Sequence, residues 1–128
     1  MGNYIPRHED LEQEALFEWA QMYAHRYPEL ALMYHIPNGG KRDRITAAKL
    51  KRQGVKPGVP DICLPVPRCG FHGLYIELKD RGGRASSAQE EWILALEAQG
   101  YRAVICVGWR EASDEIHAYL SEKVRDRR

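Results

Sequence analysis

Two carboxylates and a lysine lie at positions where they could act together: Asp61, Glu77 and Lys79. Residues 73–79 alternate between apolar and other side chains, so Glu77 and Lys79 point to the same face of a predicted strand. Asp61 lies inside the apolar run of residues 59–64, where a charge costs free energy unless it is paired or bound to a metal ion. If the two segments pair as a hairpin, the carboxylates lie side by side, and a divalent cation such as Mg²⁺ offsets their repulsion.

This grouping suits the hydrolysis of phosphodiester bonds. A divalent metal ion polarises the phosphate and lowers the pKa of a bound water. The ammonium group of Lys79 can orient that water and stabilise the charge that develops on the phosphoryl oxygens. The alternative is an exposed pair of Glu77 and Lys79 with Asp61 at a turn, and the tripeptide of residues 77–79 on its own favours that alternative.

A third acid is predicted from the first helix, which the apolar spacing places over residues 9–27, ending before Pro28. At about 100° per residue, Glu12 lies at the centre of the apolar face, between Leu16 and Trp19. An acid in that position breaks the local pattern, so Glu12 is predicted to complete an acidic pocket with the two strand carboxylates. Glu9 lies about 60° away on the same face and competes for this role.

Gln89 is a further candidate, in the first turn of a helix predicted to begin after Ser86. Its side chain could point toward the strand ends and orient a water or a phosphate. Residues 86–89 also fit a capping box, in which the glutamine side chain bonds back to the backbone of Ser86. The sequence leaves both roles open.

The elements that must position these side chains follow from periodicity and turn signals. After the first helix we expect a short strand at 33–36, a basic helix at 43–53 ended by Gly54, strands at 59–64 and 73–79, a helix from the Ser86 cap to Gly100, a strand at 101–107 and a helix at 111–120. The strand–helix–strand unit of residues 73–107 requires a parallel pair with a right-handed crossover. The predicted fold is α/β, with a mixed sheet flanked by helices.

Charge is unevenly distributed along the chain. The formal net charge is only +1, yet residues 9–29 sum to −5 and residues 38–57 sum to +6. A basic segment of this kind is either a solvated face or the footprint of a polyanion, and we predict contacts to backbone phosphates, which position DNA without reading its sequence. The predicted DNA-contacting residues are Asn38, Gly39, Lys41, Arg42, Arg44, Lys49, Lys51, Arg52, Lys56, Arg81 and Arg84.

Length and composition bound the remaining possibilities. The 128 residues suit a single domain with its core at about 9–120, and 44% hydrophobic with 29% charged residues excludes a disordered tail, a collagen-like fibre or a coiled-coil rod. No run reaches the roughly 20 apolar residues of a membrane span, and residues 1–7 lack the apolar stretch of a signal peptide, so we expect a cytoplasmic protein. Three cysteines without CxxC spacing indicate reduced thiols rather than a zinc site or disulfides.

Taken together, these motifs resemble the virus-type replication–repair nuclease (VRR-NUC) branch of the PD-(D/E)XK nuclease superfamily. The likeness is carried by Pro60-Asp61 and Glu77-Leu78-Lys79, and by the wider strings at residues 12–20, 36–40, 50–62, 75–79, 86–92 and 100–101. Each string is unspecific alone, but together they span nearly the whole chain.

The resemblance implies a restriction-endonuclease-like core and a stand-alone nuclease of the phage or bacterial kind. It implies Mg²⁺ or Mn²⁺ bound by Asp61, Glu77 and the backbone carbonyl of Leu78, with no organic cofactor. It also implies Lys79 as the catalytic lysine, with Glu12 and Gln89 in the site. A homodimer acting on branched DNA, such as four-way (Holliday) junctions, is the expected assembly and substrate.

Three alternatives remain open from the sequence. The chain could be a DNA-binding module on a nuclease fold that no longer cuts DNA. The intact, clustered carboxylates argue against this alternative, because an inactive site has no need of them. It could be a nuclease that acts on flaps or single strands. A sequence-specific, restriction-type nuclease is the third alternative, and the absence of an extra recognition segment within 128 residues makes it the least favoured.

Overall fold

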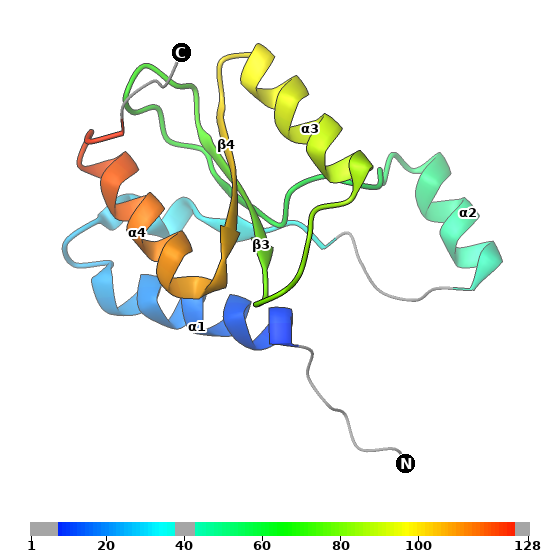
Figure 1. Ribbon diagram of the computed structural model, residues 1–128, viewed down its shortest axis with the longest axis horizontal. Helices are drawn as coiled ribbons and strands as arrows, with labels where there is room; N and C mark the ends of the chain where they lie inside the picture. The colour runs from blue at the N-terminus through cyan, green and yellow to red at the C-terminus, as the bar shows by residue number, and fades with distance from the viewer. Residues whose placement is uncertain (1–7, 38–42, 125–128) are drawn as a thin grey trace.

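The computed structural model describes residues 8–37 and 43–124 (Figure 1). The elements follow in the order α1 (His8–Tyr23), the 3₁₀ helix η1 (Pro28–Leu32), β1 (Tyr34–His35), α2 (Arg44–Arg52), β2 (Ile62–Leu64), β3 (Leu74–Lys79), α3 (Ser87–Ala98), β4 (Arg102–Val107) and α4 (Gly108–Leu120). The strands form one sheet in the order β1-β2-β3-β4. β2 pairs antiparallel with β1 and β3, whereas β3 and β4 are parallel and joined through α3. The predicted hairpin and mixed α/β sheet are confirmed.

The two faces of the sheet differ: one packs against α1 and α4, and the other carries the candidate site. Ile62, Ile76 and Leu78 point to the face on which α1 and α4 pack side by side, where they meet Leu16 and Ile116 in the core (Figure 1). Each such buried aliphatic side chain stabilises the fold by about 1.5–3 kcal/mol relative to an exposed one. Because side chains alternate along a strand, the residues between these point to the opposite face, which carries the candidate site.

Several boundaries differ from those that the sequence predicts. α1 ends at Tyr23 rather than at residue 27, and the chain then turns and forms η1, which periodicity does not predict and which buries Leu30. The second strand begins at Ile62 instead of residue 59. α4 begins at Gly108, three residues before the predicted start at 111.

The basic helix α2 stands apart from the sheet in Figure 1 and has no buried residue. Asp43 caps it, because its carboxylate accepts hydrogen bonds from the backbone N–H and the hydroxyl of Thr46. Gly54, with φ of +98°, follows its last turn in the left-handed conformation that glycine tolerates. The cationic side chains of α2 are therefore exposed to solvent and do not contribute to packing.

A membrane-crossing helix is not found in the part of the chain that the structure describes, since none of its helices has the necessary length and apolar character.

Candidate active site

Glu77 is the centre of the candidate site. It lies on β3 facing away from the core helices, yet it is only 1% exposed. Its Oε2 atom accepts a hydrogen bond from Gln89 Nε2 at 3.1 Å and lies 3.3 Å from Lys79 Nζ. Its Oε1 atom is also buried, and no hydrogen-bond donor reaches it from residues 8–37 and 43–124. A buried carboxylate oxygen without a donor is costly, and a bound cation would satisfy it.

The environment of Glu77 disfavours its charge. Burial is the largest cause, and the neighbouring Asp61 carboxylate adds to it through its charge and hydrogen bonding. Lys79 acts in the opposite direction, but the net effect raises the pKa of Glu77 to about 8. A carboxyl group with so high a pKa in a site with a second carboxylate is typical of functional positions.

Asp61 is held in place by the strands on both sides of it. Its Oδ2 atom accepts a hydrogen bond from the backbone N–H of Leu78 at 2.9 Å. Its backbone carbonyl accepts one from the N–H of Ile36 at 2.6 Å. The predicted proximity of Asp61 to Glu77 is therefore present in the structure: Glu77 lies on β3, and Asp61 immediately precedes β2.

Pro60 explains why this pairing stops next to the site. The register that pairs Ile62 with Ile76 would place Pro60 opposite Leu78. The N–H of Arg102 bonds to the carbonyl of Gly73, so on β3 the backbone groups of even-numbered residues such as Leu78 face β2. Proline has no N–H to donate to the Leu78 carbonyl, and the Leu78 N–H goes to Asp61 instead. The Leu78 carbonyl, which the family resemblance implies as a metal ligand, thus faces the β2 side of the sheet without a donor from Pro60.

Gln89 makes the predicted capping box, and its side-chain amide also reaches the candidate site. Its Oε1 atom accepts a hydrogen bond from the backbone N–H of Ser86, and the Ser86 hydroxyl accepts one from the N–H of Gln89, which completes the capping box of α3. Its Nε2 atom donates to Glu77. The start of α3 is therefore tied directly to the buried carboxylate.

Lys79 lies between two acids. Its Nζ atom is 3.3 Å from Glu77 Oε2 and 3.7 Å from Glu9 Oε1, and its side chain is largely buried. Glu9, in the first turn of α1, is the residue that the structure brings to the lysine. The helix thus supplies an acid to the site, as the sequence predicts, but from one turn earlier than Glu12.

Glu12 instead supports α4. Its Oε2 atom accepts a hydrogen bond from the backbone N–H of Trp109 at 2.6 Å, at the start of a helix whose own N-cap residue, Val107, provides no side-chain bond. A carboxylate in this position satisfies a free N–H group and interacts favourably with the helix dipole. The inward position predicted for Glu12 is thus explained by helix capping, and the ion pairs of Lys79 are with Glu9 and Glu77 rather than with Glu12.

Substitutions at the two acids should separate these roles. We expect Glu12→Ala to lower the free energy of unfolding by about 1–2 kcal/mol through loss of the cap, with a smaller effect for Glu12→Gln. We expect Glu9→Gln to leave stability nearly unchanged and to slow DNA cleavage by about tenfold or more, or ~1.4 kcal/mol. Chemical denaturation and single-turnover cleavage measure the two effects. If Glu12→Gln slowed cleavage and Glu9→Gln did not, Glu12 rather than Glu9 would be the helix acid of the site.

The donor set fits a hard divalent cation. Among the described residues, no cluster of three or more His, Cys, Asp or Glu side chains is arranged to hold a metal ion. Mg²⁺ does not require one, since it is usually bound by one or two carboxylates with waters and substrate phosphate oxygens. Asp61, Glu77 and the Leu78 carbonyl provide such a set, and the donor-free Glu77 Oε1 supports it.

Seven of the eleven predicted DNA-contacting residues lie in the part of the chain that the structure describes, in three groups. Arg44, Lys49, Lys51 and Arg52 are exposed on α2, Lys56 is exposed in the segment that follows, and Arg81 and Arg84 are exposed in the loop after β3. The remaining four, Asn38, Gly39, Lys41 and Arg42, lie outside the described residues. Exposed cations thus precede Asp61 in the chain and follow β3, the strand that carries Glu77.

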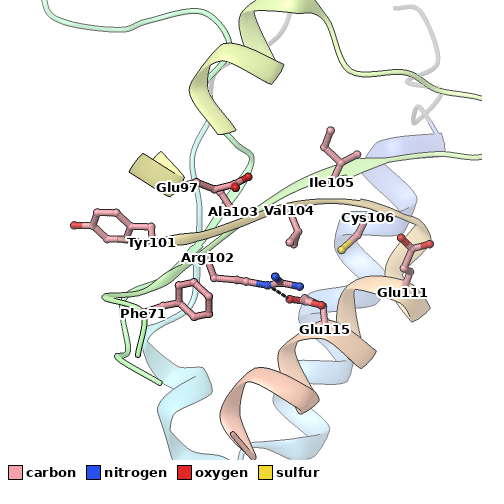
Figure 2. Close-up of a pocket in the computed structure, with 10 residues that line it drawn as sticks. All are labelled: Phe71, Glu97, Tyr101, Arg102, Ala103, Val104, Ile105, Cys106, Glu111 and Glu115. Carbon is pink, nitrogen blue, oxygen red and sulfur yellow. Dashed lines mark hydrogen bonds and ion pairs between the residues drawn. The ribbon is translucent and has the colours of Figure 1, made fainter. Parts of the chain in front are cut away.

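A separate hollow of about 480 Å³ lies beside β4 (Figure 2). It is lined by three carboxylates, Glu97, Glu111 and Glu115, and the last of these pairs with Arg102 at 2.7 Å. Burial and the neighbouring glutamates raise the pKa of Cys106 to about 12, so its thiol stays protonated. None of the predicted site residues lines this hollow, and its acidic lining disfavours a polyanion.

Comparison with known proteins adds to these observations. The family model of the VRR-NUC domain matches residues 7–109. A solved structure described as a "VRR_NUC domain protein" is similar, with a TM-score of 0.79 and 32% sequence identity, and the match covers 96% of this chain and 96% of that chain. A search of curated proteins gives no match.

Proposed function

Because this chain belongs to the VRR-NUC domain family, we propose that it is a Mg²⁺- or Mn²⁺-dependent endonuclease that hydrolyses phosphodiester bonds in branched DNA. Membership of the family makes it a nuclease-type, DNA-processing domain on a PD-(D/E)XK-like α/β fold. The finer proposal depends on the buried Glu77, whose Oε1 atom lacks a donor while Asp61 and Lys79 lie beside it.

The side chains of the site have separate tasks. A divalent cation held by Asp61, Glu77 and the Leu78 carbonyl would polarise the scissile phosphate and lower the pKa of a bound water. Gln89 and the Leu78 N–H orient the two carboxylates by hydrogen bonds of 3.1 and 2.9 Å.

Lys79 is the candidate catalytic lysine. Its ammonium group is fixed by Glu77 and Glu9, and we propose that it donates to the attacking water or to a phosphoryl oxygen. Holding the donor in place before the reaction avoids reorganisation at the moment of charge development.

The substrate proposal follows from what the fold offers for recognition. The exposed cations of α2 suit phosphate contacts, which carry no sequence information. Selection by DNA shape, with two copies of the chain placing one site on each of two strands, would suit a four-way junction. Flaps and single strands are the competing substrates, and sedimentation would test the proposed homodimer.

One panel of assays tests this function. Labelled four-way junction, flap, single-stranded and duplex DNA are each incubated with the protein in Mg²⁺, Mn²⁺ or EDTA. We expect cutting only with metal, and fastest on the branched substrates. Binding without cutting under either metal would favour the inactive DNA-binding module, and equal cutting in EDTA would refute the metal requirement.

The contribution of α2 can be measured through salt dependence. Replacing Lys49, Lys51 and Arg52 with Gln is expected to weaken binding to all DNA sequences alike. The slope of log K against log[salt] should fall by about 0.9 for each phosphate that α2 no longer neutralises. Lys123→Gln is the matched control, because Lys123 is exposed in the segment after α4, and α4 and α2 lie at opposite sides of the molecule in Figure 1. An unchanged slope in the triple variant would show that α2 does not bind DNA.

A further inference from the structure

The face of the sheet that carries Glu77 also carries a row of tyrosines. Tyr34 on β1 pairs with Cys63 on β2, and Cys63 pairs with Tyr75 on β3. Side chains of directly paired residues share a face, and Tyr75 is two positions before Glu77, so all of them lie on the same face. Two residues along a strand correspond to about 7 Å, which separates Tyr75 from Glu77 and Cys63 from Asp61. Tyr34 lies one strand beyond Cys63, about 5 Å further across the sheet.

The rings in this row are held by one another. Cys63 lies directly between Tyr34 and Tyr75, since it pairs with each of them across the sheet. The ring of Tyr75 meets that of Tyr101 edge to face, with centroids 5.4 Å apart, and Tyr101 meets His72 in the same way at 5.7 Å. Burial, followed by the charge of Cys63, raises the pKa of Tyr75 to about 12, and hydrogen bonding to Cys63 raises the pKa of Tyr34. Both tyrosines are therefore neutral near pH 7.

Tyr34 leaves much of its ring open to solvent. It is 49% exposed, whereas Cys63 beside it is only 3% exposed. The core helices occupy the opposite face of the sheet, and α3 packs along β4 rather than over β1. An exposed aromatic ring beside a buried neighbour, on the face of the sheet that carries the candidate site, is a candidate stacking surface.

We propose that Tyr34, backed by Cys63 and Tyr75, is a stacking platform for an unpaired DNA base next to the cleaved phosphate. The proposal deepens the proposed nuclease function and rests on it for the position of that phosphate. Bases stack on aromatic side chains with little sequence preference. Bases inside a duplex are already stacked on each other, so only DNA with unpaired bases gains from the platform. It would therefore supply selection by structure without sequence readout.

The experiment measures base stacking separately from cutting. The probes are a single strand and a flap, each with 2-aminopurine beside the cut position, and a fully paired duplex as reference. Binding is measured with Ca²⁺ in place of Mg²⁺, so that stacking is followed by fluorescence quenching without cleavage. The variants are Tyr34→Ala and Tyr34→Phe, and Tyr23→Ala is the matched exposed tyrosine on α1.

We expect Tyr34→Ala to bind the single strand and the flap about tenfold more weakly, a loss typical of one stacked base, and to lose the quenching. Binding to the duplex should change less than about twofold. Tyr34→Phe, which keeps the ring, and Tyr23→Ala should behave as the parent does. Equal losses on all three DNAs, or a Phe variant as weak as the Ala variant, would overturn the platform.

The outcomes also separate this proposal from the proposed function. A parent that cuts DNA, with a Tyr34→Ala variant that binds and quenches as the parent does, refutes the platform and leaves the nuclease function intact. A parent that quenches 2-aminopurine but cuts none of the substrates in Mg²⁺ or Mn²⁺ supports the platform as a DNA-binding feature and refutes the nuclease function. Unfolding curves for each variant establish that a loss of binding does not come from a loss of fold.

Discussion

Replacing Asp61 with Asn, or Glu77 with Gln, is expected to slow DNA cleavage by about a thousandfold or more, or ~4 kcal/mol in the barrier. Either change removes one of the two carboxylates that would hold the metal ion, and with it the means to polarise the phosphate and acidify a water. The amides keep the size of the side chains, so the β2–β3 pair should persist. Single-turnover cleavage at saturating protein measures the chemical step directly.

Two further measurements make this result specific to the metal site. Without metal, DNA binding by both variants should be at least as tight as in the parent, because neither change adds negative charge near phosphate and Asp61→Asn removes one. Calorimetric titration with Mn²⁺ should show a weakened metal site. Glu14→Gln, on the exposed side of α1, serves as the control and should cut normally. If Asp61→Asn cuts nearly as fast as the parent, the proposed ligand set is wrong.

The strands, their pairing and the neighbourhood of Asp61, Glu77 and Lys79 could be predicted because they follow from local signals. Alternation places Glu77 and Lys79 on one face, and the paired apolar runs bring Asp61 beside them. Gln89 could be found from its capping motif, although only the structure shows that its amide reaches Glu77. Each of these inferences uses residues within a few positions of one another, or two strands joined by a short turn.

The sequence could not specify the contacts between segments that are far apart in the chain. The pattern of α1 predicts Glu12 in the metal pocket, because it is an acid on an apolar face. The structure shows that its partner is the N–H of Trp109, 97 residues later in the chain. The same contact explains why the predicted start of α4 is three residues late, since the acceptor for its first turn comes from another helix. Likewise, periodicity does not reveal that Tyr34 lies on the same face of the sheet as Glu77, because β1 has only two residues and shows no alternation.

The second large effect concerns stability without metal. Glu77 has an ordinary pKa near 4.5 when unfolded and a pKa of about 8 in the folded chain. Below pH 4.5 the group is protonated in both states and costs nothing. Between pH 4.5 and 8 the unfolded chain releases this proton while the folded chain retains it. The stability of the folded state therefore falls as pH rises through this window, by about 1.4 kcal/mol per pH unit at most, and is constant above it.

Glu77→Gln removes this dependence, so the variant with almost no cleavage activity should be the more stable protein at pH 8. Near pH 4.5 the two proteins should have almost equal free energies of unfolding. At pH 8 without metal, the free energy of unfolding of the variant should be higher by about 3–5 kcal/mol. Denaturant unfolding at several pH values measures the gap, and subtracting the two curves cancels the other titrating groups. Glu91→Gln, at an exposed position of α3, should show no such gap. A parent whose advantage over the variant grows with pH would contradict the raised pKa.

Adding Mg²⁺ should then make the parent more stable than the Glu77→Gln variant. Metal binds the ionised carboxylate of the folded parent and stabilises it by RT ln(1 + [Mg²⁺]/Kd), whereas the Gln variant gains little. Because the cation must displace the proton from Glu77, its affinity for the parent should rise with pH up to about 8. Cleavage at subsaturating metal should follow the same rise. Under the proposed function, the buried carboxylate that weakens the metal-free fold at neutral pH is also the group that would bind the cation, so the cost in stability and the gain in cleavage would have a single origin.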